Sequence, residues 1–178
     1  MSHNSRARRT AAAAGLGVAL AAGMTGAAAA ESAARTVDVR GQFFAQPDGS
    51  YRSTGDFLGT YTLLSEEQVS STRVGGYTLK IIKGSDQLAG CLDLNHNRKC
   101  DRHGPRGTIT MAFQRVATFS ASGAVFIESS CTHPVTRVVN TGRFNQFTGG
   151  LIFMADQARD GRGGDVKSTY RGTITIKR

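Results

Sequence analysis

The segment Cys91–Asp101 carries the densest group of side chains that could do chemistry. Oxygen donors recur there at alternate positions. The residues that could bind a cation through a side chain or a carbonyl group are Asp93, Asn95, Asn97, Lys99 and Asp101. Oxygen donors at this spacing are how a short loop wraps a hard cation such as Ca²⁺. We therefore predict a calcium site formed by these five residues.

The loop departs from a complete EF-hand loop, so we expect the site to be weak. An EF-hand has glycine at position six and a bidentate glutamate at position twelve, and these positions hold Arg98 and Gly104 here. Basic side chains also oppose a cation; they are Arg98, Lys99, Arg102 and Arg106. Extracellular calcium modules bind with a Kd of about 10⁻⁴–10⁻³ M, and we expect an affinity in that range.

Two alternatives to calcium stay open for this loop. In the first, the Asp and Asn side chains bond only to their own backbone and hold no ion. In the second, the loop binds zinc through two thiolates and two imidazoles. The residues of that possible set are Cys91, His96, Cys100 and His103. Their spacing matches no common zinc finger.

Three cysteines imply one disulfide and one remaining thiol if the protein works in an oxidising compartment. We predict the pair Cys91–Cys100, because it is local and brackets the loop. Pairing of one of them with Cys131 is the alternative. Cys131 lies two residues before His133, and a thiol beside an imidazole can act as nucleophile and base. Residues two apart on a strand share a face without necessarily touching, so a structural cysteine is the preferred interpretation.

Scattered carboxylates could include one that faces the interior of a barrel. They are Asp38, Asp56, Asp86 and Glu128. Asp56 and Glu128 are weak catalytic candidates, because each lies in an otherwise apolar strand. A buried carboxyl has a raised pKa and can act as an acid or a base. A surface position is the default for both residues.

Residues 1–30 have the pattern of a secretory signal. A positive start is followed by an apolar stretch, Ala11–Ala22, and by small residues that end at Ala30. We expect export by the general secretory route, a secreted product, and contact with a membrane only during export. Residues 31–36 would form a short linker and residues 37–178 one domain.

The chain is basic, with a formal net charge of +9 that falls to +6 if the three arginines of residues 1–30 are removed. A basic exported protein favours anionic surfaces such as cell-envelope polymers. The Lys and Arg residues are scattered and no nucleic-acid-binding motif appears, so we expect no nucleic-acid partner.

The mature chain alternates apolar and polar residues with a period of two, which is the pattern of β-strands. The expected strands are 37–40, 55–64, 77–81, 87–92, 108–113, 124–130, 150–155 and 173–177. Turn signals separate them at residues 46–50, 75–76, 83–86, 104–105 and 160–164. Only Ser65–Ser71 could form a helix. We predict an all-β fold, a single antiparallel eight-stranded barrel.

Glycine-rich segments resemble those of the allene oxide cyclase and dirigent superfamily, which carries a V-x-G-T-G-x-F-x-x-A-x-G run. The similar segments are Val139–Phe144, Phe147–Gly150, Gly55–Gly59 and Tyr170–Thr173. Asn140 stands where the family has glycine. The resemblance implies an eight-stranded barrel with an apolar central cavity, and no catalytic residue is carried over. The calcium loop resembles the Asp-x-Asp-x-Asp-x-x-Cys-Glu loop of exported Excalibur modules.

We expect a non-enzymatic exported binding protein whose ligand is a small apolar molecule or an anionic envelope polymer. An isomerase or cyclase of the allene oxide cyclase kind is the alternative, and a structural role without ligand is a third. The first two require a lumen of about 300 Å³ or more for a small molecule.

Overall fold

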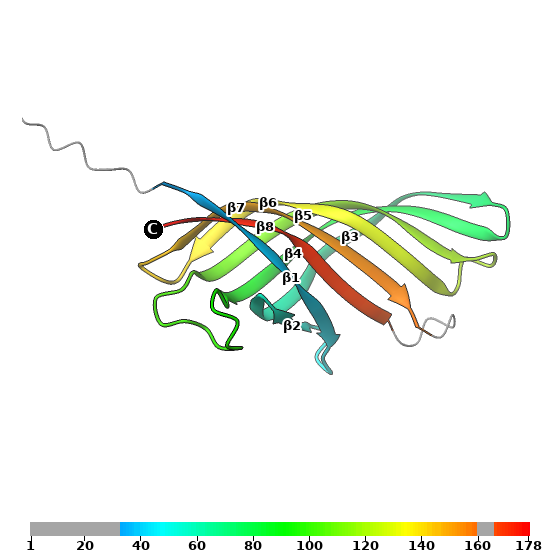
Figure 1. Ribbon diagram of the computed structural model, residues 1–178. Coiled ribbons are helices and arrows are strands. Elements are labelled where there is room, and N and C mark those ends of the chain that lie inside the picture. The colour runs from blue at the N-terminus through cyan, green and yellow to red at the C-terminus, as the bar shows by residue number, and fades with distance from the viewer. Residues whose placement is uncertain (1–32, 160–165) are drawn as a thin grey trace, which may run out of the picture. The chain divides into compact units, whose positions relative to one another are not determined.

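A computed structural model of the chain describes residues 33–159 and 166–178, which lie in one compact unit, residues 32–178. The predicted signal, residues 1–30, and the turn predicted at 160–164 lie outside the described residues. Eight antiparallel strands close into a barrel in which β1 pairs with β8 (Figure 1). The strands are β1 (Arg35–Ala45), β2 (Tyr51–Gly55), β3 (Phe57–Val74), β4 (Tyr77–Leu92), β5 (Arg106–Ser120), β6 (Phe126–Asn140), β7 (Gln146–Ala158) and β8 (Val166–Lys177).

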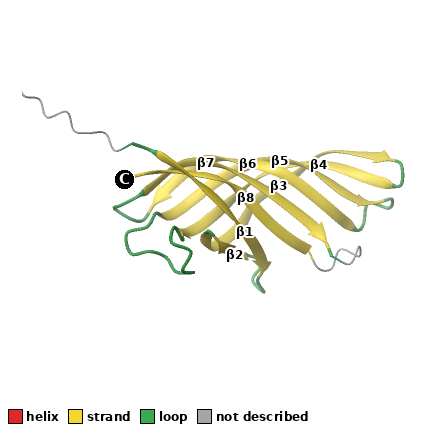
Figure 2. Cartoon of the chain, viewed as in Figure 1, coloured by secondary structure: helices red, strands yellow, loops and turns green. Residues whose placement is uncertain are grey.

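The predicted fold class is confirmed. Figure 2 shows strands joined by loops throughout the described residues. Within that part of the chain no helix is long and apolar enough to cross a membrane. The expected linker 31–36 overlaps the first strand, because β1 already begins at Arg35.

Alternate residues of each strand point into the barrel, as the period of two predicts. In β5, for example, Ile109, Met111 and Phe113 are buried, the residues between them are half-buried, and Gln114 and Val116 beyond them are exposed. In β6 the same alternation buries Ser129 and His133 and leaves Cys131 half-buried. The residues between these three are exposed. The strand register therefore decides which side chains can meet in the lumen.

Apolar side chains fill one end of the barrel, which we call the packed end. Here β4 and β8 end and β5 and β7 begin. Its fully buried side chains include Phe57, Leu92, Ile109, Phe147 and Ile176. The rings of Phe57 and Phe147 stack with their centroids 6.0 Å apart. The opposite end, where β1 ends and β8 begins, is the open end.

Two expectations about local structure are wrong. Ser65–Ser71 is strand rather than helix, because it pairs with β4 along its length. The turn expected at Lys83–Asp86 is absent, because β4 runs without a break through these residues. A Cβ atom on Gly84 would lie 2.7 Å from the ring of Phe113. Gly84 thus provides room for an aromatic ring and makes no turn.

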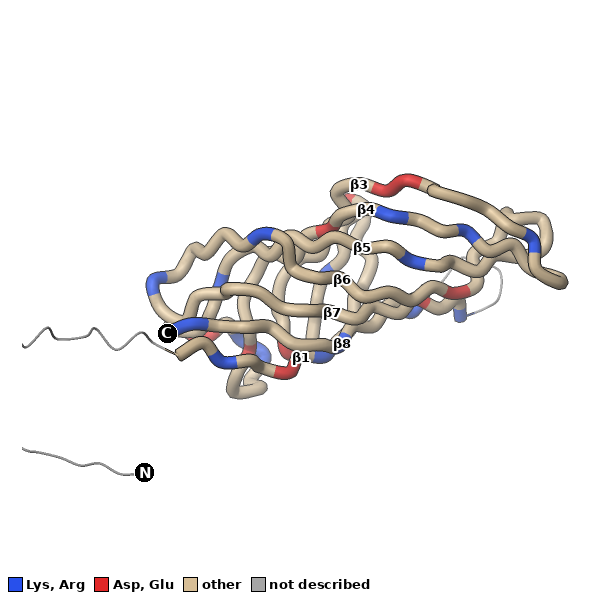
Figure 3. Tube along the Cα trace, turned by 90° about the horizontal axis from the view of Figure 1, so that it is seen from above, with Lys and Arg blue, Asp and Glu red and all other residues tan. Residues whose placement is uncertain are grey.

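Basic residues are spread over several strands of the barrel and form no single cluster on the trace (Figure 3). Several of them also lie over aromatic rings or beside carboxylates, as Arg171 lies 5.0 Å from the ring centroid of Phe153 and Lys83 lies 3.2 Å from Glu67. The scattered distribution agrees with the sequence.

Candidate functional site

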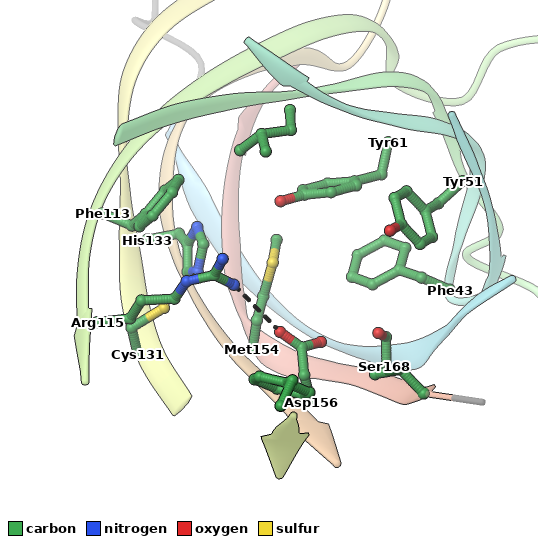
Figure 4. A pocket seen from close by; sticks show the side chains of 13 residues that line it. Phe43, Tyr51, Tyr61, Phe113, Arg115, Cys131, His133, Met154, Asp156 and Ser168 are labelled. Atoms are coloured by element: carbon green, nitrogen blue, oxygen red, sulfur yellow. Dashed lines mark hydrogen bonds and ion pairs between the residues drawn. The ribbon is translucent and has the colours of Figure 1, made fainter. Parts of the chain in front are cut away.

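The open end of the barrel holds a pocket of about 220 Å³. Its lining combines aromatic rings with polar side chains (Figure 4). The lining residues are Phe43, Tyr51, Tyr61, Leu63, Phe113, Arg115, Phe126, Cys131, His133, Met154, Asp156, Val166 and Ser168. Leu63 and Val166 are exposed, so the pocket opens to solvent at this end. It is smaller than the lumen of about 300 Å³ that a drug-sized ligand requires.

Cys131 and His133 touch inside this pocket. The Sγ atom of Cys131 lies 2.8 Å from the Nε2 atom of His133. Both residues occupy inward positions of β6, and the exposed residue between them points outward. His133 is buried, and Cys131 is half-buried and free of any disulfide. Cys131 was interpreted as a structural cysteine, and its contact with His133, a residue of β6, was not predicted.

Asp86 lies behind His133, on the side away from Cys131. Its Oδ2 atom is 2.7 Å from the Nδ1 atom of His133 and accepts a hydrogen bond of 3.1 Å from the hydroxyl of Tyr61. The contact with His133 is close but is not an aligned hydrogen bond, and the Oδ1 atom of Asp86 has no partner among the described residues. Asp86 is completely buried. A buried carboxylate that lacks a full set of partners is costly to fold.

The ring of Phe113 limits the movement of the imidazole. Its centroid lies 5.1 Å from that of His133, with the two planes inclined by 35°. Gly84 admits this ring, as described above. Gly84 of β4 thus lets Phe113 pack against His133, and this packing helps to keep the imidazole between the thiol and the carboxylate.

Arg115 brings a positive charge to the same pocket. Its guanidinium group donates to Glu66 at 2.8 Å and to Asp156 at 3.4 Å. Asp156 also accepts a hydrogen bond of 3.1 Å from Ser129. The buried Nε atom of Arg115 has no partner among the described residues. Arg115 therefore lines the pocket with a guanidinium group that is already paired with two carboxylates.

Burial shifts two acidic groups of the site in the same direction. It raises the pKa of Cys131 to about 12, against an opposing effect of the charge on Arg115. Burial also raises the pKa of Tyr61, and the neighbouring Asp86 charge adds to that effect. Both groups are therefore neutral in the resting protein, and the thiol can donate its proton to the imidazole nitrogen.

The carboxylates singled out from the sequence lie elsewhere. Glu128 is exposed on β6 and points away from the lumen. Asp56 lies between β2 and β3, where it accepts a hydrogen bond from the backbone of Arg40 and lies 3.1 Å from His96. Neither residue faces the lumen, in agreement with the surface position that was the default for both. The inward carboxylates are Asp86 and Asp156, and Asp86 belonged to the wider set of candidates.

The predicted disulfide Cys91–Cys100 is present and closes the loop that follows β4. Its Cα atoms are 5.7 Å apart. The bond consumes both thiolates of the possible zinc set, and His96 faces Asp56 instead. The zinc alternative is therefore contradicted.

The five predicted calcium ligands lie together in this loop, but hydrogen bonds already use the side-chain oxygens of its Asp and Asn residues. The carboxylate of Asp93 accepts from the amides of Asn97 at 3.0 Å and Arg98 at 2.6 Å. Asn95 and Asn97 accept from the amide two residues further on, at 3.3 Å and 2.9 Å. Asp101 accepts from the side chain of Asn95 at 2.6 Å. This is the self-bonded arrangement of the first alternative.

The loop backbone is folded to suit these bonds. His96 and Arg98 have φ angles of 56° and 63°, in the left-handed region that turns the chain sharply. Each carboxylate oxygen has further lone pairs, so the hydrogen bonds leave room for a cation at Asp93 and Asp101. Within the described residues no three His, Cys, Asp or Glu side chains gather as a metal-binding group.

Comparison with protein-family models, with curated proteins and with solved structures finds no match to this chain.

Proposed function

We propose that this protein is an exported β-barrel that binds a compact, amphipathic molecule of about one ring in the pocket at its open end. The observation that carries the proposal is the pocket of about 220 Å³ itself, with aromatic walls and a buried polar cluster. Few convergent polar groups in an otherwise apolar cavity are typical of a ligand site.

The volume sets the size of the ligand. A cavity of about 150 Å³ holds benzene, so 220 Å³ accommodates a single ring with one or two small substituents. An envelope polymer cannot enter such a space. A long flexible substrate of the cyclase kind would need a lumen of about 300 Å³ or more. Size therefore favours the compact ligand over both.

The side chains that line the pocket determine which chemical groups the ligand should carry. Phe43 and Phe113 offer apolar faces, and Tyr61, Arg115 and Asp156 offer donors and acceptors. The ligand should accordingly carry a planar apolar part together with a group that both donates and accepts hydrogen bonds. A purely apolar molecule would leave the buried polar atoms without partners, which costs binding free energy.

The family relationship is part of this proposal. The eight-stranded closed barrel and the glycine-rich segments near Asn140 and Gly172 support kinship with the allene oxide cyclase and dirigent superfamily. The signal-like residues 1–30 and the disulfide support export to an oxidising compartment.

A pair of matched substitutions tests the pocket. Ser168 points into it and is buried, whereas Ser130 is exposed on the outer face. Isothermal titration with benzamide, phenol and 4-nitrophenol should detect binding to the wild type. Ser168→Leu should abolish this binding because it fills the pocket, and Ser130→Leu should leave it unchanged. Equal affinities for the two variants, or no binding of any ring compound, would exclude the proposal.

We also propose weak calcium binding by the loop of Asp93–Asp101, as a stabilising element at the packed end. The disulfide supports this second role because it holds the loop in shape before any ion binds. A ligand that binds only the folded state raises stability by RT ln(1 + [L]/Kd). Melting curves should therefore shift upward in 10 mM CaCl₂ and not in 10 mM MgCl₂.

The calcium test needs a control for the hydrogen bonds of Asp93. Asp93→Ala removes two acceptor bonds to backbone amides and lowers the melting temperature without any ion. The informative quantity is therefore the calcium-dependent shift within each variant. It should vanish in Asp101→Asn and persist in Glu67→Gln. A shift of equal size in Asp101→Asn would contradict calcium binding at this loop.

A further inference from the structure

We propose that Cys131, His133 and Asp86 form a nucleophilic triad that takes an acyl group from a small aromatic ester bound in the lumen. This inference rests on the proposed function, since the ester would occupy the same pocket, and it adds a covalent step to binding.

The distances between the three side chains fit the roles of nucleophile, base and positioning group. The thiol of Cys131 is 2.8 Å from the Nε2 atom of His133, within the distance a general base requires. The Nδ1 atom on the far side of the ring is 2.7 Å from Asp86. A nucleophile, a base and a group that orients the base are the three parts by which such sites are recognised.

The three residues also differ in their access to a bound substrate, as their roles require. Cys131 and His133 line the pocket, whereas Asp86 does not and is completely buried behind them. A substrate can therefore reach the sulfur and the base, and only the imidazole and Tyr61 reach the carboxylate. Asp86 is a positioning residue: its charge favours the imidazolium form of His133 when that ring takes a proton.

The fourth part is a donor for the developing oxyanion. Arg115 lines the same pocket, and its charge favours the thiolate form of Cys131 against the effect of burial. Its Nε atom is buried, so an ester oxygen would meet the guanidinium group at the Nη atoms, which also donate to Asp156 and Glu66. Figure 4 shows the guanidinium group projecting into the pocket from the strand that lies between those of His133 and Asp86. A preorganised donor of this kind stabilises a tetrahedral intermediate.

The reaction balances with water as the second substrate. The Nε2 atom of His133 takes the thiol proton while the sulfur attacks the ester carbonyl carbon. The bond from that carbon to the leaving oxygen breaks, and His133 gives its proton to the leaving oxygen as the phenol departs. Water, deprotonated by His133, then attacks the thioester and the carbon–sulfur bond breaks. His133 returns the proton to the departing sulfur, which restores the thiol as the carboxylic acid leaves.

Burial explains why the attack needs the imidazole. The thiol keeps its proton at neutral pH, so no thiolate exists before the ester binds. Deprotonation and attack then occur together, with His133 as the base. An isolated thiol with the same burial would be inert, which makes the base the decisive part of the proposal.

The experiment uses p-nitrophenyl acetate with the purified, disulfide-intact protein. Release of p-nitrophenolate and the intact mass are followed together, and the acetyl group is located by peptide mapping. We expect a thioester at Cys131, the third of the chain's three cysteines and the one free of a disulfide. Cys131→Ala should lose the adduct, and Thr132→Ala, on the outer face of the same strand, should keep it.

Two further variants separate chemistry from folding. His133→Gln should lower the acylation rate constant by about 100-fold or more, the usual contribution of a general base. Asp86→Asn should lower it by about tenfold or more and leave the KM for the ester unchanged, since a merely structural role would change both. Acylation of lysines or tyrosines at the wild-type rate in Cys131→Ala, or an unchanged rate in folded His133→Gln, would overturn the triad.

Failure of the triad and failure of the binding proposal give different results. Saturable binding of 4-nitrophenol with neither a thioester nor release of p-nitrophenolate that depends on Cys131 would overturn the triad and leave ligand binding intact. A thioester at Cys131 without saturable binding of any ring compound would support the triad and contradict the binding proposal.

Discussion

The two ends of the barrel differ in how completely their polar groups are satisfied. At the packed end the loop of Asp93–Asp101 is closed by a disulfide, and each of its Asp and Asn side chains accepts a hydrogen bond within the loop. At the open end the completely buried Asp86 and the buried Nε atom of Arg115 keep polar atoms without partners among the described residues. The first arrangement stabilises the fold and the second costs stability.

This difference indicates where function lies. A buried carboxylate beside a buried imidazole destabilises a protein unless it is fully paired, and such groups cluster at functional sites. An apolar filling like that of Phe57 and Phe147 would have stabilised the open end as well. That the open end lacks such a filling favours a ligand or a reaction there, and the predictions below test this contrast.

The largest effect is expected from breaking the buried contact between Asp86 and His133 at the open end. His133→Ala removes the Nδ1 atom that lies 2.7 Å from the completely buried Asp86 and should lower the free energy of unfolding by about 3 kcal/mol, because a buried polar group loses its neighbour. The double variant Asp86→Leu/His133→Leu should recover most of this loss, since well-packed apolar residues often replace a buried polar pair without cost. Urea denaturation measures both. A double variant as unstable as the single one would mean that the pair stabilises the barrel.

The next effect concerns the packed end. Replacing Cys91 and Cys100 by alanine should lower the free energy of unfolding by about 2–3 kcal/mol, since the disulfide closes a loop with a sequence separation of 9. Benzamide affinity should not change, because the loop lies at the opposite end from the pocket. Loss of benzamide binding in a variant that is still folded at the assay temperature would show that the two ends are coupled.

A smaller effect depends on pH. Burial raises the pKa of Cys131 from its ordinary 9.0 to about 12, so the unfolded chain releases this proton first as pH rises. Stability should therefore fall from about pH 9 upward, and less steeply in Cys131→Ala. The slope should stay below the full value of about 1.4 kcal/mol per pH unit, since solvent screens a half-buried thiol. Urea midpoints at pH 7.5 to 10.5 measure the difference, and parallel curves for the two proteins would contradict it.

The period-two pattern predicted the all-β barrel and its number of strands. The number is right only because two errors in the strand assignment cancel. Residues 77–81 and 87–92 were expected as separate strands and form parts of β4, while β2 was not expected at all. Gly84 was interpreted as a turn residue, although it lies in the strand to accommodate Phe113. Sequence alone does not reveal a ring on a neighbouring strand.

The same error concealed the site. Asp86 stands among polar residues that suggested a turn, so its inward position went unnoticed, whereas Asp56 and Glu128 stood out among apolar neighbours. The alternation of faces along β4 was the available signal. Asp86 is an even number of residues from Ile82 and Leu88, which are both buried, so it shares their inward face. The contact of Cys131 with His133 depended on side-chain orientation, which spacing does not determine.

The smallest and sharpest contrast is between two adjacent glutamates of β3. Glu66 accepts from Arg115 at 2.8 Å, and Glu67 lies 3.2 Å from Lys83 with both side chains more than half exposed. Glu67→Gln should change stability by less than about 0.5 kcal/mol and leave benzamide affinity unchanged, as is usual for surface ion pairs. Glu66→Gln should alter that affinity several-fold, because it removes one anchor of the guanidinium group in the pocket. Titration calorimetry on the two variants compares them directly. An equal response would mean that Arg115 does not shape the pocket, and the polar cluster that matters for binding would then reduce to Cys131, His133 and Asp86.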